Sequence, residues 1–290
     1  MTNLERVHNY YDDPAISQSK IKELLGYGKP SAAAMVLGSL VDSIVTMPEH
    51  VDDLYAFGEV PDKYSATFKM VEYMVNNDMD IAYDKDILAV HELFNHQSNW
   101  KAETKIAKFR ANEYLFYFML NTKGKKVVSI EDKMQADSIA NQLLDHIPEG
   151  SRFQVDVYDQ LFGVKCKGLI DVFAPDDTIY DIKVLSSPVK DIKYMLKKMR
   201  TDMQLSFYKE LSGVKPNPKV LIYSTSDNEV VTYEMTDLDL SIGKFGFNKS
   251  GVLNVDGESY AYETTTYGWY HGIHAYLGQS INKQQPTLWM

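Results

Sequence analysis

The sequence predicts an α/β fold in which a mostly helical N-terminal half is followed by a half rich in β-strands. Up to residue 147, apolar residues recur at helical spacing, as Ile106 and Phe109 illustrate. From Pro148 on, Val, Ile, Phe and Tyr alternate with polar residues, as in 153–158, which is typical of strands. With 290 residues, of which 44% are hydrophobic, the chain is long enough to bury a sizeable core.

The N-terminal half is expected to contain several helices. Pro48 ends the most apolar of them, because proline cannot continue a helix. Ser129 and Asp132 resemble a capping pair at the start of the last one. The helices are expected at about 17–26, 31–46, 84–97, 101–120 and 131–146.

The second half is expected to hold strands, one long helical segment and a further hairpin around Asp227-Asn228. No internal repeat or low-complexity segment divides the chain, so we expect a single domain over residues 1–290. This domain would comprise a mostly helical part (1–147), a catalytic sheet and helix (148–240) and a tail without assignment (241–290). The expected strands are 153–158, 164–173, 178–185, 219–226 and 230–236, and the expected helix is 189–211.

Composition excludes several classes of protein. No apolar run is long enough to span a membrane, and the N-terminus lacks the pattern of a signal peptide. The lone Cys166 cannot support a disulfide framework or a four-cysteine metal site, so a cytoplasmic location is expected. The net charge of −10 argues against nucleic acid. However, six basic residues and a single acid lie between Lys183 and Arg200, which could form a local basic surface.

The segment from Gly168 to Lys183 carries the strongest chemical signal. The residues Pro175-Asp176-Asp177 are typical of a turn between two strands. A turn centred on residue 176 places Asp171 opposite Asp181, with Cβ atoms about 5 Å apart on one face of the sheet. Lys183 follows two residues later and is expected to point to that same face.

Two facing carboxylates repel each other unless a proton or a cation intervenes. Mg²⁺ (or Mn²⁺), held by Asp171, Asp181 and the backbone carbonyl of Ile182, would remove that conflict. Such an ion activates water and binds a phosphodiester, while Lys183 can orient the water or offset developing charge. The alternative is a surface-facing Asp–Lys pair on an edge hairpin.

A helix after the hairpin fits the same chemistry. Gln204 and Tyr208 are four residues apart and therefore share one face of a helix. They could contribute to a DNA site, or they could simply anchor the helix to the core. The basic residues expected to contact the DNA backbone are Lys190, Lys193, Lys197 and Arg200.

Three motifs occur in order along the chain: Gly168-x-x-Asp171, Asp181-x-Lys183 and Gln204-x-x-x-Tyr208. This series resembles the RecB/RecE-like branch of the PD-(D/E)XK nuclease superfamily, which includes lambda-exonuclease-type phage exonucleases. The resemblance implies a restriction-endonuclease-like fold, with a mixed central sheet flanked by helices. It also implies that the two acids ligate a metal, that the lysine assists the nucleophile, and that the last motif contributes to DNA binding.

Two positions depart from the pattern of that family. An upstream G-x-x-x-H motif often supplies a further metal ligand, but here Gly38 is followed by Asp42. Asp42 could ligate Mg²⁺ or could be a helix-packing residue. Relatives also often carry a glutamate on the strand before the hairpin, where this chain offers Gln154, with Glu149 and Asp156 nearby.

The resemblance implies a Mg²⁺-dependent exonuclease that hydrolyses duplex DNA ends, in the 5′ to 3′ direction, for phage-type recombination or repair. It further implies a homo-oligomeric ring, a single-strand annealing protein as partner, and the cytoplasm of a bacterial host if the chain is phage-encoded. An endonuclease and a catalytically inactive nucleic-acid-binding protein with the same fold are the alternatives. A Mg²⁺-dependent hydrolase of small phosphate esters is a third, weaker one, because no base pocket is encoded.

Overall fold

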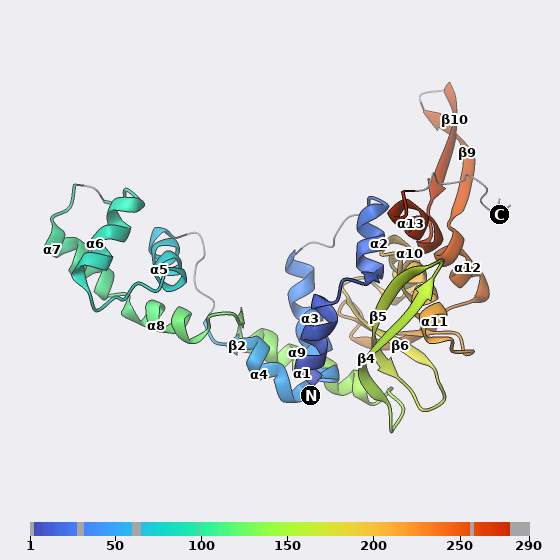
Figure 1. The fold of residues 1–290 in the computed structure, drawn as a ribbon, viewed down its shortest axis with the longest axis horizontal. Coiled ribbons are helices and arrows are strands. Elements are labelled where there is room, and N and C mark those ends of the chain that lie inside the picture. The colour runs from blue at the N-terminus through green and yellow to red at the C-terminus, as the bar shows by residue number, and fades with distance from the viewer. Residues whose placement is uncertain (1–2, 28–31, 60–64, 98, 256–257, 279–290) are drawn as a thin grey trace. The chain divides into compact units, whose positions relative to one another are not determined.

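The chain has a mixed α/β structure (Figure 1). The computed structural model describes residues 3–27, 32–59, 65–97, 99–255 and 258–278. None of the described helices is long and apolar enough to cross a membrane. The chain divides into two compact units, one formed by Met1–Pro48 with Ala136–Met290 and the other by Glu49–Gln135.

A mixed sheet of six described strands forms the centre of the first unit (Figure 1). Strands β4–β5, β5–β6 and β7–β8 pair antiparallel, whereas β1–β5 and β6–β7 pair parallel. The mixed sheet, the predicted strands and the second hairpin are therefore confirmed. The strands are β1 (Ile16–Ser17), β4 (Arg152–Leu161), β5 (Val164–Phe173), β6 (Ile179–Leu185), β7 (Lys219–Ser224) and β8 (Glu229–Glu234).

Two helices of the first unit begin at side-chain caps. The Ser17 hydroxyl accepts a hydrogen bond from the Lys20 N–H at the start of α2. Thr236 and Asp239 form a capping box at the start of α12. The helices are α1 (Asn3–Asp12), α2 (Gln18–Leu24), α3 (Ala32–Thr46), α9 (Ile130–Leu144, which enters this unit from the second), 3₁₀ helix η2 (Val189–Asp191), α10 (Ile192–Lys198), α11 (Thr201–Ser212), α12 (Asp237–Phe245) and α13 (Trp269–Tyr276).

The tail without an assignment from the sequence is described over residues 241–255 and 258–278. It consists of the end of α12, a hairpin of strands β9 (Phe247–Val255) and β10 (Glu258–Thr266), and α13. Trp269 at the start of α13 is fully buried and donates from its indole nitrogen to the Ser206 hydroxyl of α11, at 3.0 Å. The tail thus completes the core of the first unit. Residues 279–290 lie outside the described part of the chain.

One hydrophobic cluster joins the sheet to α11 and α13. Ile170, Leu205, Phe207, Val220 and Trp269 are all fully buried within it. The burial of each such side chain stabilises the fold by roughly 1.5–3 kcal/mol. This core holds α11 against β4 and β5, which fixes the position of the helix that carries Gln204.

The second unit has a core of its own, in which Met70, Val71, Met74 and Ile87 are fully buried. This separate core was not expected, because the sequence prediction treated 1–147 as one helical part of a single domain. The helix predicted over 101–120 is two helices that separate around Asn112. The elements are 3₁₀ helix η1 (Pro48–His50), α4 (Val51–Leu54), β2 (Tyr55–Phe57), α5 (Ala66–Asn76), α6 (Asp84–Leu93), α7 (Ala102–Arg110), α8 (Glu113–Asn121) and β3 (Lys126–Val128).

Candidate active site

The β5–β6 hairpin has the predicted register but opens where its acids lie. Phe173 pairs with Ile179, and Val172 pairs with Tyr180. The same register would place Asp171 opposite Asp181, yet the described ladder between β5 and β6 stops one residue short of them. The carboxylate of Asp176 accepts from the Thr178 N–H at 3.0 Å, so this acid stabilises the turn.

The side chain of Asp171 replaces part of the missing ladder. Its Oδ2 accepts a hydrogen bond from the backbone N–H of Ile182 at 2.9 Å. Strand β6 is held on its other edge by parallel pairing with β7, where Ile182 lies beside Leu221. The backbone between Asp181 and Lys183 is therefore fixed from both sides.

Asp181 is the most enclosed acid of the site, with an exposed fraction of 1%. Its Oδ1 accepts from Lys183 Nζ at 2.8 Å and from Gln204 Nε2 at 2.8 Å. Its Oδ2 also lies 2.8 Å from Lys183 Nζ, but it is buried without a hydrogen-bond partner among the described residues. Asp181 thus connects the hairpin to α11, and the charge of Lys183 compensates its second carboxylate oxygen.

Asp42 joins the same charge cluster from α3, which contacts β5 and β6. Its Oδ1 is buried, and no described group donates a hydrogen bond to it. Burial raises the pKa of Asp42 to about 6, with Lys183 opposing the shift and Asp181 adding to it. Asp42 therefore lies close enough to Lys183 and Asp181 for their charges to act on its carboxyl group.

The remaining pKa shifts reflect an excess of negative charge. Burial, followed by the charges of Asp42 and Asp181, raises the pKa of Asp171 well above its usual range. Burial lowers the pKa of Lys183, but Asp181 and Asp171 outweigh it, so the net shift is upward. Three carboxyl groups therefore surround one lysine, which stays protonated.

The donor set of this cluster fits a hard divalent cation. Buried carboxylate oxygens without a partner are unusual in proteins, and Asp42 Oδ1 is such an atom among the described residues, while Asp181 Oδ2 has only the ammonium group of Lys183 beside it. Carboxylates are the ligands that Mg²⁺ prefers. No described group of three or more His, Cys, Asp and Glu side chains already has metal-binding geometry, so a cation would have to displace Lys183 from Asp181.

Gly168 explains how α11 comes so close to β5. A Cβ atom at this position would lie 2.9 Å from the ring Cδ1 of Tyr208 and 3.0 Å from the Cγ2 of Val157. Tyr208 is buried, and burial raises its pKa well above the usual range. Of the predicted DNA contacts on α11, Gln204 therefore faces Asp181, and Tyr208 packs against the sheet.

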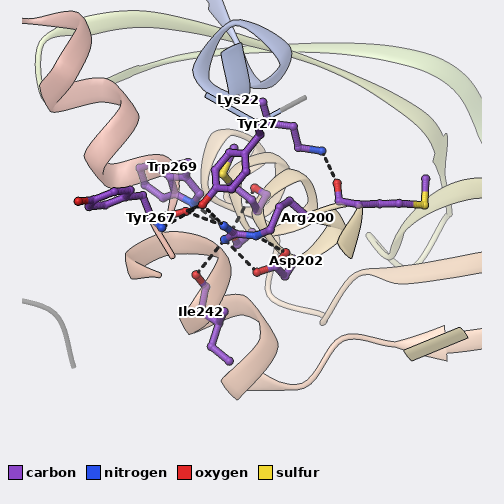
Figure 2. Close-up of polar contacts among 10 residues, drawn as sticks. Lys22, Tyr27, Arg200, Asp202, Ile242, Tyr267 and Trp269 are labelled. Carbon is purple, nitrogen blue, oxygen red and sulfur yellow. Dashed lines mark hydrogen bonds and ion pairs between the residues drawn. The ribbon is translucent and has the colours of Figure 1, made fainter. Parts of the chain in front are cut away.

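Of the four basic residues expected to contact the DNA backbone, three are exposed lysines: Lys190, Lys193 and Lys197. The prediction that Arg200 contacts the DNA backbone is wrong. Arg200 is buried and adopts a left-handed backbone conformation (φ 55°) between α10 and α11. Its guanidinium binds both carboxylate oxygens of Asp202, at 3.1 and 3.2 Å (Figure 2). The chain turns at this residue, so its side chain points into the protein and is not free to contact DNA.

Arg200 instead ties the start of α11 to the tail. It donates to the carbonyl of Tyr267 at 2.7 Å and to the hydroxyl of Tyr27, which in turn hydrogen-bonds to the backbone of Tyr267 (Figure 2). It also reaches the carbonyl of Ile242 at the longer distance of 3.5 Å. This network holds the helix of Gln204 in place from outside the site.

The three candidates for a further acidic ligand have different surroundings. Gln154 has a left-handed backbone (φ 47°) at the position of β4 whose register faces Asp171, and its amide donates to the Thr46 hydroxyl at 2.9 Å. Glu149 is exposed, and Asp156 forms an ion pair with Arg6 at 3.4 Å. Gln154 is therefore the one nearest to the site, but it contributes no carboxylate.

Lys22 and Thr46 are two residues near the site that the motifs did not reveal. Thr46 lies one helical turn after Asp42, so the helical spacing could have indicated it. Lys22 lies on the short helix α2. Burial lowers its pKa, the charge of Lys183 lowers it further, and the charge of Asp181 raises it. Nothing in the local sequence distinguishes Lys22 from other surface lysines.

We expect Asp42→Asn to stabilise the metal-free protein at pH 8 by roughly 1–3 kcal/mol. The pKa of Asp42 is about 6 in the folded chain, above the 3.8 of a free carboxyl group, so its ionised form opposes folding above pH 6. The gain should vanish near pH 4, where the folded carboxyl group is already protonated. Urea denaturation in EDTA at both pH values measures this, and an equal or larger gain at pH 4 would contradict it.

Comparison with known proteins gives only distant likenesses. No protein-family model and no curated protein matches the chain. Among solved structures, the chain is similar to an inferred exonuclease from Eubacterium rectale, with 18% identity, coverage of 83% of this chain and 79% of that chain, and a TM-score of 0.41. It is also similar to the protein SSO0001, with 12% identity, coverage of 60% and 78%, and a TM-score of 0.26. Function has to be inferred from the site residues themselves.

Proposed function

We propose that this protein is a Mg²⁺-dependent DNA exonuclease (Mn²⁺ serving as an alternative ion) that hydrolyses phosphodiester bonds at duplex ends. The observation that carries the proposal is the cluster of buried carboxylates around Lys183, in which Asp181 pairs with the lysine and Asp42 Oδ1 accepts no hydrogen bond from any described group. Asp181 and Lys183 lie on β6 just beyond the described ladder with β5, and Asp42 comes from α3, which contacts both strands. Recombination or repair is the proposed setting.

The residues would divide the work as follows. Asp171, Asp181 and Asp42, with the carbonyl of Ile182, would hold the cation, which when bound lowers the pKa of water and binds the phosphate oxygens. Lys183 has a raised pKa and is therefore a cation, not a general base. It would stabilise negative charge that develops on the phosphate or orient the attacking water. Gln204 positions Asp181 through their 2.8 Å hydrogen bond.

DNA binding would use the exposed lysines of η2 and α10 despite the net charge of −10. Lys190, Lys193 and Lys197 are the exposed basic residues of the predicted set, and lysine ammonium groups bind phosphates independently of sequence. The 5′ to 3′ direction, the homo-oligomeric ring and the single-strand annealing partner stay predictions from the family resemblance.

The test is nucleotide release from linear duplex DNA in Mg²⁺, measured beside the same DNA as a closed circle. An exonuclease releases acid-soluble nucleotides from the linear form only, and EDTA abolishes release. Cleavage of the circle would instead establish an endonuclease. Binding to the linear duplex without release in Mg²⁺ or Mn²⁺ would favour the inactive binding protein. That protein is the second candidate, because no group of three or more metal-binding side chains is already assembled among the described residues.

A further inference from the structure

Lys22 is a second lysine near the site, outside all three motifs. It lies on α2, which contacts α11 and α13. The neighbouring Ile21 is fully buried, and a Cβ atom on Gly272 of α13 would lie only 2.3 Å from its Cγ2. Such close packing leaves α2 little freedom, so the backbone of Lys22 has a defined position relative to α11.

The ammonium group of Lys22 is only partly satisfied. Its Nζ donates to the carbonyl of Met199, at the C-terminal end of α10, at 2.8 Å (Figure 2). A lysine ammonium has three donors, so this capping contact leaves two of them over. No carboxylate in the described part of the chain forms a hydrogen bond or an ion pair with Lys22. Arg200, by contrast, has Asp202 as a direct partner.

The ammonium group of Lys22 is largely buried, and charges of both signs act on it. Burial lowers its pKa from 10.5 to about 8; Lys183 and Arg200 lower it too, and Asp181 and Asp202 oppose them. A half-buried cation in such surroundings is stabilised by an anion that approaches from the site.

We propose that Lys22 binds a phosphate group of the DNA backbone beside Lys183, as a second phosphate-contacting cation of the same site. The inference rests on the proposed function, because it takes a nucleic-acid strand to be the ligand. Capping of α10 alone would account for one donor of Lys22. It would not account for the two remaining donors, nor for a position within range of the charges of Lys183 and Asp181.

The test compares Lys22→Gln with a matched control, Lys20→Gln. Glutamine can still donate to the Met199 carbonyl, so α10 keeps its cap. Lys20 lies on the same helix but is exposed, and it pairs with Glu23 at 3.0 Å. Binding of a labelled, 5′-phosphorylated short duplex is measured by fluorescence anisotropy in EDTA over a series of KCl concentrations, so that no cleavage is needed.

We expect Lys22→Gln to weaken binding about ten-fold, as for the loss of one charge-assisted hydrogen bond. The slope of log K against log [KCl] should fall by about 0.9, the value for one phosphate contact on duplex DNA. Lys20→Gln should change neither quantity, and Lys22→Arg should retain the slope. Melting temperatures of all variants check that the fold is intact.

Two outcomes overturn the proposal, and they are distinguishable. If the wild-type protein binds and degrades DNA but Lys22→Gln keeps the full salt slope, the role of Lys22 is wrong and the nuclease proposal stands. If the wild-type protein neither binds nor degrades DNA, the proposed function is wrong, and this inference is wrong with it.

Discussion

Asp181→Asn is expected to reduce Mg²⁺-dependent DNA cleavage by about 10³-fold or more. The variant keeps the shape of the side chain and its hydrogen bond from Gln204, but it removes the charge that would hold the cation. A catalytic metal contributes several kcal/mol, and each 1.36 kcal/mol corresponds to a factor of ten in rate. Initial rates of nucleotide release at saturating Mg²⁺ measure the loss.

Asp176→Asn is the matched control for that variant. Asp176 lies at the turn of the same hairpin, is exposed, and uses its carboxylate to accept from the Thr178 N–H, which asparagine can also do. Its cleavage rate should stay within a factor of about two, since exposed substitutions away from a site have small effects. Comparable rates for Asp181→Asn and Asp176→Asn would show that the chemistry lies elsewhere.

Arg200→Ala is expected to destabilise the first unit by about 3–5 kcal/mol. The substitution leaves Asp202 as an uncompensated buried charge and removes the donors to Tyr27 and Tyr267 (Figure 2). Urea denaturation followed by the fluorescence of Trp269 measures the change. The background should carry Trp100→Phe and Trp289→Phe, so that the signal reports this unit alone.

Lys197→Ala separates stability from DNA binding in this comparison. Lys197 is an exposed lysine of α10, three residues before Arg200, so its removal should change the free energy of unfolding by less than about 0.5 kcal/mol. Its effect should instead be weaker DNA binding. If Arg200→Ala unfolds normally and loses only DNA affinity, the buried role assigned to Arg200 is wrong.

The centre of the candidate site could be predicted because it is local in sequence. The turn at Pro175-Asp176-Asp177 and the alternation on both sides determine the register, and the register brings Asp171 near Asp181. Gln204 could be placed for a similar reason, since one helix carries it and Tyr208. Short-range spacing was sufficient in both cases.

The parts that could not be predicted depend on contacts between distant segments. The buried position of Arg200 requires Tyr27, which follows α2, and Tyr267, which follows β10, and both lie far from it in sequence. Lys22 gains its place near Lys183 only through the packing of α2 against α11 and α13. The helices of the second unit pack into a core of their own. The spacing of apolar residues within each helix predicts the helix but not which other helices it packs against.

The location of a bound Mn²⁺ ion tests the central claim most directly. Anomalous scattering from Mn²⁺-soaked crystals should show an ion that contacts the carboxylates of Asp171 and Asp181 and the carbonyl of Ile182, at about 2.0–2.2 Å. The ion should be absent from crystals of Asp181→Asn. Mn²⁺ bound only at other positions, or bound equally well in that variant, would contradict a phosphodiester-cleaving metal site at this hairpin.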